Sequence, residues 1–242
     1  MLGIFEGLGG LEEYNNSGAL IGLDALDDTE LLGALKRMNP VKRQRTINKL
    51  ANTGTPSRGS RAEMEKFFAE LPAHIKEGLG NGTLRLCDSL IYSIKPVNSK
   101  TIKIFEPQDD RQIGLRNISN AKLQKNQVLL VSGLVLLAGT SADGTQDNIM
   151  ATDYKSIEGF PAIVNGEIDL KANKKIILPE TGNYVFKTSN MHFVPIGYYK
   201  LANPRLIEDD VPIELTISLG STTGIAANTY IYAALHGTGT TA

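Results

Sequence analysis

The chain has 242 residues, of which 25 are Lys or Arg and 26 are Asp or Glu, so its formal net charge is -1. Its 41% hydrophobic content is typical of a globular protein, and its single cysteine, Cys87, excludes a scaffold of disulfides within the chain. The longest apolar run, residues 128–138, is well short of the roughly 20 residues that a membrane helix needs. No basic region or cleavage site of a secretory signal follows Met1, so we expect neither export nor a membrane-spanning segment.

Charges near the start of the chain fall into two opposed blocks. Residues 1–35 contain seven acids and no base, whereas residues 36–61 contain eight bases and no acid. The basic block could neutralise nucleic-acid phosphates, with affinity gained from counterion release and, since it has no aromatic residue, little base preference. It could instead pair with the acidic block of the same or a neighbouring subunit, or remain solvated. The candidate contact residues are Lys36, Arg37, Lys42, Arg43, Arg45, Lys49, Arg58 and Arg61.

Local signals in residues 1–80 predict an N-terminal arm of short helices. Asp27 or Asp28 can cap a first helix, which Pro40 ends, and Pro40 also suits the first position of a second helix. Ser60 and Glu63 form a capping-box pattern before a third helix. The third helix would bury Met64, Phe67, Phe68 and Leu71. Helices this short are marginal in isolation, so we expect them to dock on another surface.

From residue 84 onward, short apolar runs alternate with turn residues, which predicts strands. Roughly eight to eleven strands without βαβ alternation predict an antiparallel jelly roll or β-sandwich over residues 84–236. The fold class is therefore mainly β, with a short helical arm before the sandwich. Asn165 and Gly166 should form a two-residue hairpin turn, residues 139–159 a long loop, and residues 237–242 a flexible tail. The predicted strands are residues 84–94, 101–105, 113–118, 127–138, 162–164, 167–170, 175–178, 184–188, 193–200, 212–219 and 229–235.

Alternation also predicts which side of two strands is buried. In residues 213–219 the apolar side chains alternate with polar ones, so they should share one face. In the last strand, two sets should lie on opposite faces: Tyr230, Tyr232 and Ala234 on one, and Ile231, Ala233 and Leu235 on the other.

Motifs for catalysis are missing from the sequence. It contains no nucleophile elbow, no phosphate-binding loop and no dinucleotide-binding glycine pattern. The histidines His74, His192 and His236 have no metal-ligand spacing. We interpret Cys87 and His192 as structural residues and His236 as an exposed one. We therefore expect no enzymatic activity and no cofactor.

One segment has ligands of the type that a hard cation prefers. Asp143 and Asp147 lie in a glycine-containing loop with further oxygen-bearing side chains, so they are the weak candidates for a calcium-type ion. The segment lacks the spacing of an EF-hand and its closing glutamate, and the same residue types dominate ordinary turns. The favoured interpretation is a turn without metal.

A basic N-terminal section, followed by a jelly-roll-like β domain without catalytic motifs, resembles the capsid (coat) proteins of icosahedral, non-tailed bacteriophages. Residues 115–134 have a similar character, reading LRNISNAKLQKNQVLLVSGL. The resemblance implies a virion protein that is made in the host cytoplasm and self-assembles into an icosahedral shell. Its partners would be capsid neighbours, other virion proteins and packaged nucleic acid. The alternatives are a carbohydrate- or receptor-binding β-sandwich of a phage fibre or head-decoration protein, and a helix-turn-helix DNA-binding regulator.

Overall fold

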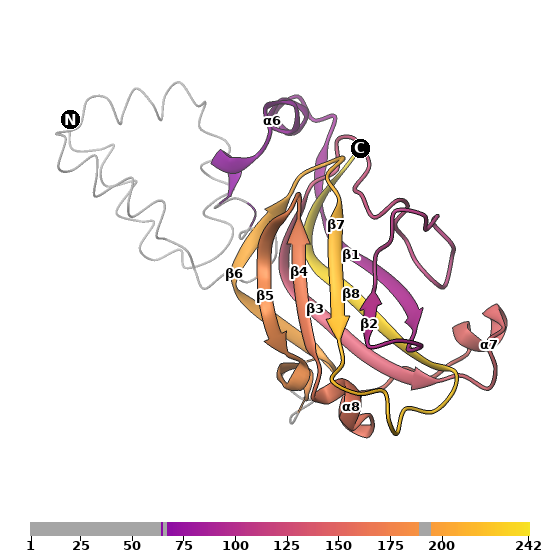
Figure 1. Cartoon of the computed structure of the whole chain (residues 1–242). Coiled ribbons are helices and arrows are strands. Elements are labelled where there is room, and N and C mark those ends of the chain that lie inside the picture. The colour runs from indigo at the N-terminus through magenta and orange to yellow at the C-terminus, as the bar shows by residue number, and fades with distance from the viewer. Residues whose placement is uncertain (1–63, 65–66, 189–194) are drawn as a thin grey trace, which may run out of the picture. The chain divides into compact units, whose positions relative to one another are not determined.

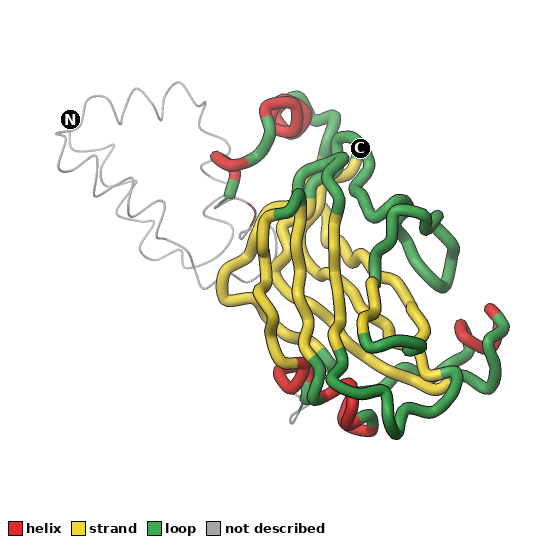
Figure 2. The backbone as a smooth tube through the Cα atoms, viewed as in Figure 1, coloured by secondary structure: helices red, strands yellow, loops and turns green. Residues whose placement is uncertain are grey.

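The computed structural model describes residue 64, residues 67–188 and residues 195–242 (Figure 1). Most of this part of the chain is strand and loop, with short helices at the two ends of the strands (Figure 2). The α-helices are α6 (Ala73–Gly80), α7 (Gln146–Met150) and α8 (Pro161–Val164), and the 3-10 helices are η2 (Phe68–Glu70), η3 (Ile157–Gly159) and η4 (Asn183–Phe186). The strands are β1 (Arg85–Pro96), β2 (Thr101–Lys103), β3 (Leu129–Thr140), β4 (Glu167–Ala172), β5 (Lys175–Gly182), β6 (Tyr198–Ile207), β7 (Ile213–Ser218) and β8 (Thr229–Thr241).

The strands form two packed antiparallel sheets of four strands each (Figure 1). Sheet A has the order β1-β8-β3-β6, and sheet B has the order β2-β7-β4-β5. The prediction of a mainly β protein with an antiparallel β-sandwich is confirmed at this level. The long pairings join strands that are far apart in sequence, as in the register of Leu90 with His236.

The strand pairs are nested in chain order. The first strand pairs with the last, β2 with β7, β3 with β6, and β4 with β5. The innermost pair, β4 and β5, is a hairpin, and each further pair encloses the one before it. Residues 85–241 therefore fold as one long hairpin, and its successive strand pairs alternate between sheet A and sheet B.

Apolar side chains from both sheets fill the space between them, because alternate residues of a strand point to the same face. The predicted alternation in residues 213–219 is confirmed, since Ile213, Leu215, Ile217 and Leu219 all belong to this core. The two predicted faces of β8 are also confirmed. Ile231, Ala233 and Leu235 enter the core, whereas Tyr230 packs in a separate cluster with Ile94, Leu115 and Ile149.

The predicted hairpin turn at Asn165 and Gly166 is wrong. Asn165 has a φ of -83° and follows the last residue of α8, whereas a type I′ turn needs positive φ at both central residues. The two-residue hairpin lies instead at Asn173 and Lys174, which have φ values of 49° and 63° and join β4 to β5. A tertiary contact accounts for the glycine at position 166, because an added Cβ there would overlap the Ser218 carbonyl oxygen of β7.

Several other predicted strands are wrong. Residues 162–164 belong to α8, whose first residue is Pro161, a residue that favours the first helical position. Residues 184–186 belong to η4. Residues 113–118 form turns with isolated bridges, because Gly114 has a φ of 86° and reverses the chain. The predicted loop at residues 139–159 contains α7 and η3 and begins after Thr140, and β6 begins only at Tyr198.

The predicted flexible tail at residues 237–242 is also wrong, since β8 continues to Thr241. Gly239 pairs with Cys87 of β1 on one side and with Leu129 of β3 on the other. The absence of a side chain is required at Gly237, where an added Cβ would overlap the Leu130 carbonyl oxygen. Glycine in this segment therefore allows close strand contact rather than flexibility.

The described residues between Met64 and Gly80 pack on the outer side of sheet A. Met64, Leu71 and Ile75 are buried in one cluster with Leu84, Val128 and Leu130. This arrangement agrees with two of the predicted buried positions, Met64 and Leu71, but Phe68 is 48% exposed. Met64, Leu71 and Ile75 therefore contact the sandwich. The first two predicted helices lie outside the described residues, so the arm itself stays a prediction.

Candidate functional site

The predicted nucleic-acid or inter-subunit contact residues lie outside the part of the chain that the structure describes. This holds for the whole basic set, Lys36, Arg37, Lys42, Arg43, Arg45, Lys49, Arg58 and Arg61, and for the acidic block before it. Their role therefore stays a prediction.

The weak metal candidates, Asp143 and Asp147, lie at the start of α7. The Asp143 carboxylate accepts hydrogen bonds from the backbone N–H of Thr145, at 2.8 Å, and from its hydroxyl, at 2.5 Å. Hydrogen bonding by the Thr145 side chain, with further bonds from Asn148 and the Thr145 backbone, holds the pKa of Asp143 below its ordinary value. The described residues contain no group of three or more His, Cys, Asp or Glu side chains able to hold a metal ion. The geometry is that of a turn leading into a helix.

Cys87 and His236 both lie on sheet A. The Cys87 thiol is half-buried and donates to the Gly239 carbonyl at 3.6 Å, and burial raises its pKa, which disfavours the reactive thiolate. His236 is half-buried against the edge of the Tyr198 ring, contrary to the predicted exposure. Both residues therefore have structural surroundings, and His192 lies outside the described residues.

The outer faces of the two sheets differ in chemistry. On sheet B, the outward side chains include charged residues from β2, β4 and β7: Lys103, Glu167, Asp169, Lys171 and Glu214. On sheet A, the outer face carries mostly uncharged and apolar side chains: Leu90, Tyr92, Val135, Leu137, Tyr198, Tyr232, Ala234 and His236. Two charged residues, Asp88 on β1 and Lys200 on β6, also lie on this face. Leu90 is 41% exposed within this face. Sheet B thus presents a charged outer face that suits contact with solvent, whereas sheet A presents a mostly apolar outer face of the kind that protein contacts cover.

Tyrosines dominate one end of that apolar face. Tyr92 and Tyr232 stack with their ring centroids 5.4 Å apart, and Tyr154 lies 6.0 Å from Tyr232. The Tyr154 hydroxyl donates to the Ile149 carbonyl at 3.1 Å. Burial raises the pKa of Tyr154 to about 12, so this phenol stays neutral through the physiological range. The rings contact one another and form a packed patch.

Residues 106–117, named here the edge segment, cover part of the free edge of β1. The Asn117 side chain accepts from Tyr92 N–H at 2.8 Å and donates to the Leu90 carbonyl at 2.6 Å. Further along, Ile94 N–H donates to the Leu115 carbonyl at 2.9 Å. These bonds satisfy edge groups that would otherwise be open to another strand.

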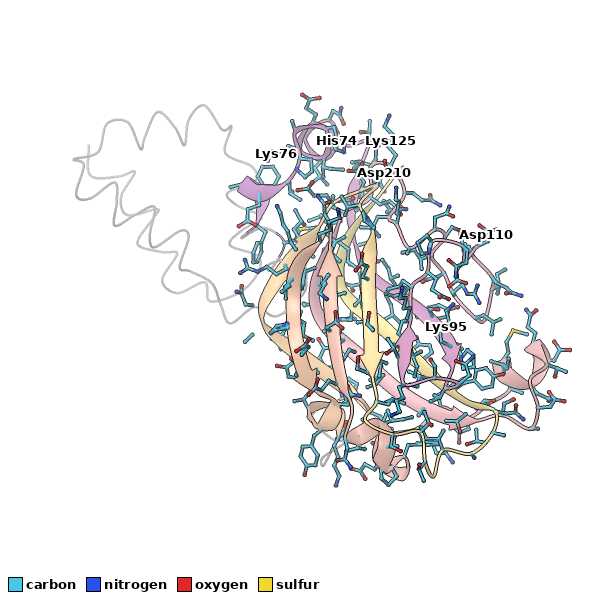
Figure 3. The ribbon with its side chains drawn as sticks, in the orientation of Figure 1. His74, Lys76, Lys95, Asp110, Lys125 and Asp210 are labelled. Carbon is cyan, nitrogen blue, oxygen red and sulfur yellow. The ribbon has the colours of Figure 1, made fainter. Side chains whose placement is uncertain are left out.

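A cluster of charges anchors the edge segment to β1. Lys95 Nζ, 11% exposed, pairs with Glu106 and lies 2.7 Å from Asp109 Oδ2, and Asp109 Oδ1 accepts from Arg116 Nη1 at 2.9 Å. The contact of Lys95 with Asp109 is an ion pair without the alignment of a hydrogen bond. Figure 3 labels Lys95 on the sandwich and Asp110, the residue after Asp109, in the neighbouring loop. Two of these ion pairs join the edge segment to β1, and the third lies within the segment.

Beside β1 lies a groove of about 300 Å³. Its walls come from the first half of β1, from the loop before β3 and from the end of β8. Arg111 and Lys122 line it, and none of the described residues that line it is an Asp or a Glu. Uncharged polar residues, Ser89, Ser119, Gln124 and Gln127 among them, also line it.

No sequence motif predicts this groove. Arg111 and Lys122 are isolated cations in a mixed polar stretch, without a motif around them. They meet because the loop folds back along β1, where Arg111 N–H donates to Ser119 Oγ at 2.8 Å. Only that fold brings both cations to one cavity.

No protein-family model matches this chain, and no curated protein matches it significantly. Among the helices in the described part of the chain, none is long and apolar enough to cross a membrane.

Proposed function

We propose that this protein is a capsid subunit whose sandwich is a jelly roll and which self-assembles into an icosahedral virion shell. The observation that carries the proposal is the nested pairing of strands, first with last through to β4 with β5. Eight strands in two sheets built from such enclosed pairs are typical of jelly rolls, a fold that viral capsid domains share with lectins and cupins. The sequence resemblance to coat proteins of non-tailed bacteriophages favours the first of these.

The chemistry of the sheet surfaces supports assembly through faces and loops. The mostly apolar outer face of sheet A, with Leu90 41% exposed, is a surface that a second copy would shield from water. Repeated contacts between identical subunits close into shells when their geometry is fixed, so a rigid sandwich suits the role.

The sheet edges oppose uncontrolled strand addition. The edge segment covers part of β1, β2 has only three residues, and the edge strands β5 and β6 contain Pro179 and Pro204. Proline lacks the N–H that a pairing strand needs, so these edges are poor templates for aggregation. A subunit stored at high concentration before assembly benefits from such protection.

The basic block would then contact packaged nucleic acid or the acidic block of a neighbouring subunit. Both alternatives give salt-dependent binding, because both rest on charge. The protein would be made in the host cytoplasm and function in the virion, beside other virion proteins.

Assembly of the purified full-length chain tests the proposal. We expect closed particles by electron microscopy, or large defined oligomers by analytical ultracentrifugation, when protein concentration and salt are varied with and without added single-stranded nucleic acid. A strictly monomeric protein under all of these conditions would overturn it.

A second candidate is a receptor- or carbohydrate-binding β-sandwich, and the tyrosine patch of Tyr92, Tyr154 and Tyr232 favours it, since aromatic faces pack against sugars. Glycan-array binding by a monomeric protein, lost in Tyr92→Ala, would favour this candidate. Assembly without glycan binding would favour the capsid subunit. The regulator alternative rests on residues outside the described part of the chain.

A further inference from the structure

The groove beside β1 has a charge composition different from that of its surroundings. Two cations, Arg111 and Lys122, contribute to its lining, while Asp110 and Asp210 lie next to these residues without lining it. Lys125 and Asp210 are both labelled at this end of the sandwich in Figure 3. A small anion inside the groove would meet the cations first, whereas a long polyanion would also approach the flanking carboxylates.

The Arg111 guanidinium has no carboxylate partner among the described residues. Its planar set of N–H donors suits the oxygens of a phosphate group, which it can bind through two parallel hydrogen bonds. Arg111 N–H donates to Ser119 Oγ at 2.8 Å, which fixes the backbone that carries the guanidinium. Ser119 uses its oxygen as the acceptor there, so its hydroxyl proton is left for a further acceptor.

Among the described residues, the Lys122 ammonium group is held only by an exposed ion pair. Its Nζ lies 3.1 Å from Asp210 Oδ1, with the two side chains 42% and 83% exposed. Pairs of this kind contribute little to stability, so the ammonium group can turn towards a bound anion at small cost. The residues that line the groove include the buried Ile91, Ile118 and Leu129. Apolar surroundings lower the local dielectric constant, so they strengthen the attraction between a cation and an anion.

We propose that this groove binds a small phosphate-type anion, such as inorganic phosphate or the phosphate of a mononucleotide, through Arg111 and Lys122 with Ser119 as an additional donor. Its volume of about 300 Å³ is at the lower end for small-molecule pockets, so it accommodates a compact ligand. The proposal is independent of whether the protein assembles into a shell.

Titration calorimetry on the full-length chain tests it, with inorganic phosphate, a nucleoside monophosphate and a single-stranded oligonucleotide as separate probes. We expect phosphate and the mononucleotide to bind, and Arg111→Gln and Lys122→Gln each to weaken binding by about tenfold, as expected for a lost charged hydrogen bond. The matched control is Lys125→Gln, which removes an exposed cation of the same loop that does not line the groove. The control should bind like the unaltered protein.

Three outcomes would overturn the proposal. The first is no heat of binding with phosphate or mononucleotide at millimolar concentration. The second is an equal loss in Lys125→Gln and Arg111→Gln, which would mean diffuse surface attraction. The third is tight, Arg111-dependent binding of the oligonucleotide alone, which would make the groove part of a nucleic-acid surface. Circular dichroism of each variant confirms that the fold is retained, and the exposed positions of Arg111 and Lys125 make this the expected result.

Discussion

The side chain of Asn117 occupies the place of a neighbouring strand beside Tyr92. Its Oδ1 accepts from Tyr92 N–H at 2.8 Å, while its Nδ2 donates to the carbonyl of Leu90 at 2.6 Å. One side-chain amide thus provides hydrogen-bond partners for two backbone groups on the edge of β1, the Tyr92 N–H and the Leu90 carbonyl. Through these two bonds from its side chain to the backbone, Asn117 links the edge segment to β1, the strand that pairs with β8.

Replacing this amide should weaken the fold and open the edge. We expect Asn117→Ala to lower the free energy of unfolding by about 1 kcal/mol, since two solvent-accessible hydrogen bonds are lost. Urea denaturation measures the change, and light scattering measures the aggregation that an open edge favours. Asn98→Ala, in the exposed turn after β1, is the control. Equal stability of the two variants would argue against the edge role.

Asp109 should contribute more to the free energy of unfolding than an ordinary loop residue does. Asp109→Asn leaves the poorly exposed Lys95 and Arg116 without their shared anion, so we expect a loss of about 2 to 3 kcal/mol in unfolding free energy. Asp153→Asn breaks an exposed ion pair with Lys155 and should cost less than about 0.5 kcal/mol. Chemical denaturation compares them, and similar losses would contradict a buried anchoring cluster.

Gly237→Ala tests whether the end of the chain is a packed strand. An added Cβ would overlap the Leu130 carbonyl oxygen, so we expect destabilisation by about 2 kcal/mol or more, or failure to fold. At Gly220, by contrast, an added Cβ meets no atom within 4 Å, and Gly220→Ala should change stability by less than about 0.5 kcal/mol. Thermal unfolding separates the two. A neutral Gly237→Ala would support the flexible tail that the sequence predicts.

Leu90→Asp should block self-association if the outer face of sheet A is an inter-subunit surface. A carboxylate placed among these mostly apolar side chains would lose its hydration on assembly, which opposes burial of the face. Thr101→Asp places the same charge on the exposed, polar face of sheet B and should assemble normally. Sedimentation velocity of both proteins gives the answer. Normal assembly by Leu90→Asp would exclude this face as the contact.

Tyr154 should make stability depend on pH at the alkaline end. Burial raises its pKa from 10.0 to about 12, so the folded state favours the neutral phenol. The stabilisation is complete below pH 10 and is lost as the pH rises through about 12. We expect Tyr154→Phe to remove a late step from the ultraviolet titration of tyrosinate and to reduce the loss of stability above pH 10. An unchanged titration curve would contradict the burial of this hydroxyl.

Alternation determined the parts of the fold that depend on one strand at a time. Residues such as Leu215 and Ile231 could be assigned to the core because a strand with a period of two has only one way to bury its apolar side. Turn position could not be assigned in the same way. Asn165-Gly166 has the better hairpin sequence, yet the hairpin forms at Asn173-Lys174, because pairing of β4 with β5 and β7 sets the register.

The sequence by itself determined a mainly β sandwich, its alternating core faces and the opposed charge blocks in residues 1–61, since these follow from local spacing and composition. Only the tertiary structure decided the nested strand order, the pairing of the last residues in β8 and the meeting of Arg111 with Lys122 in one groove. Each of these depends on contacts between residues far apart in the chain. Such contacts are selected by the packing of whole sheets, which no local pattern encodes.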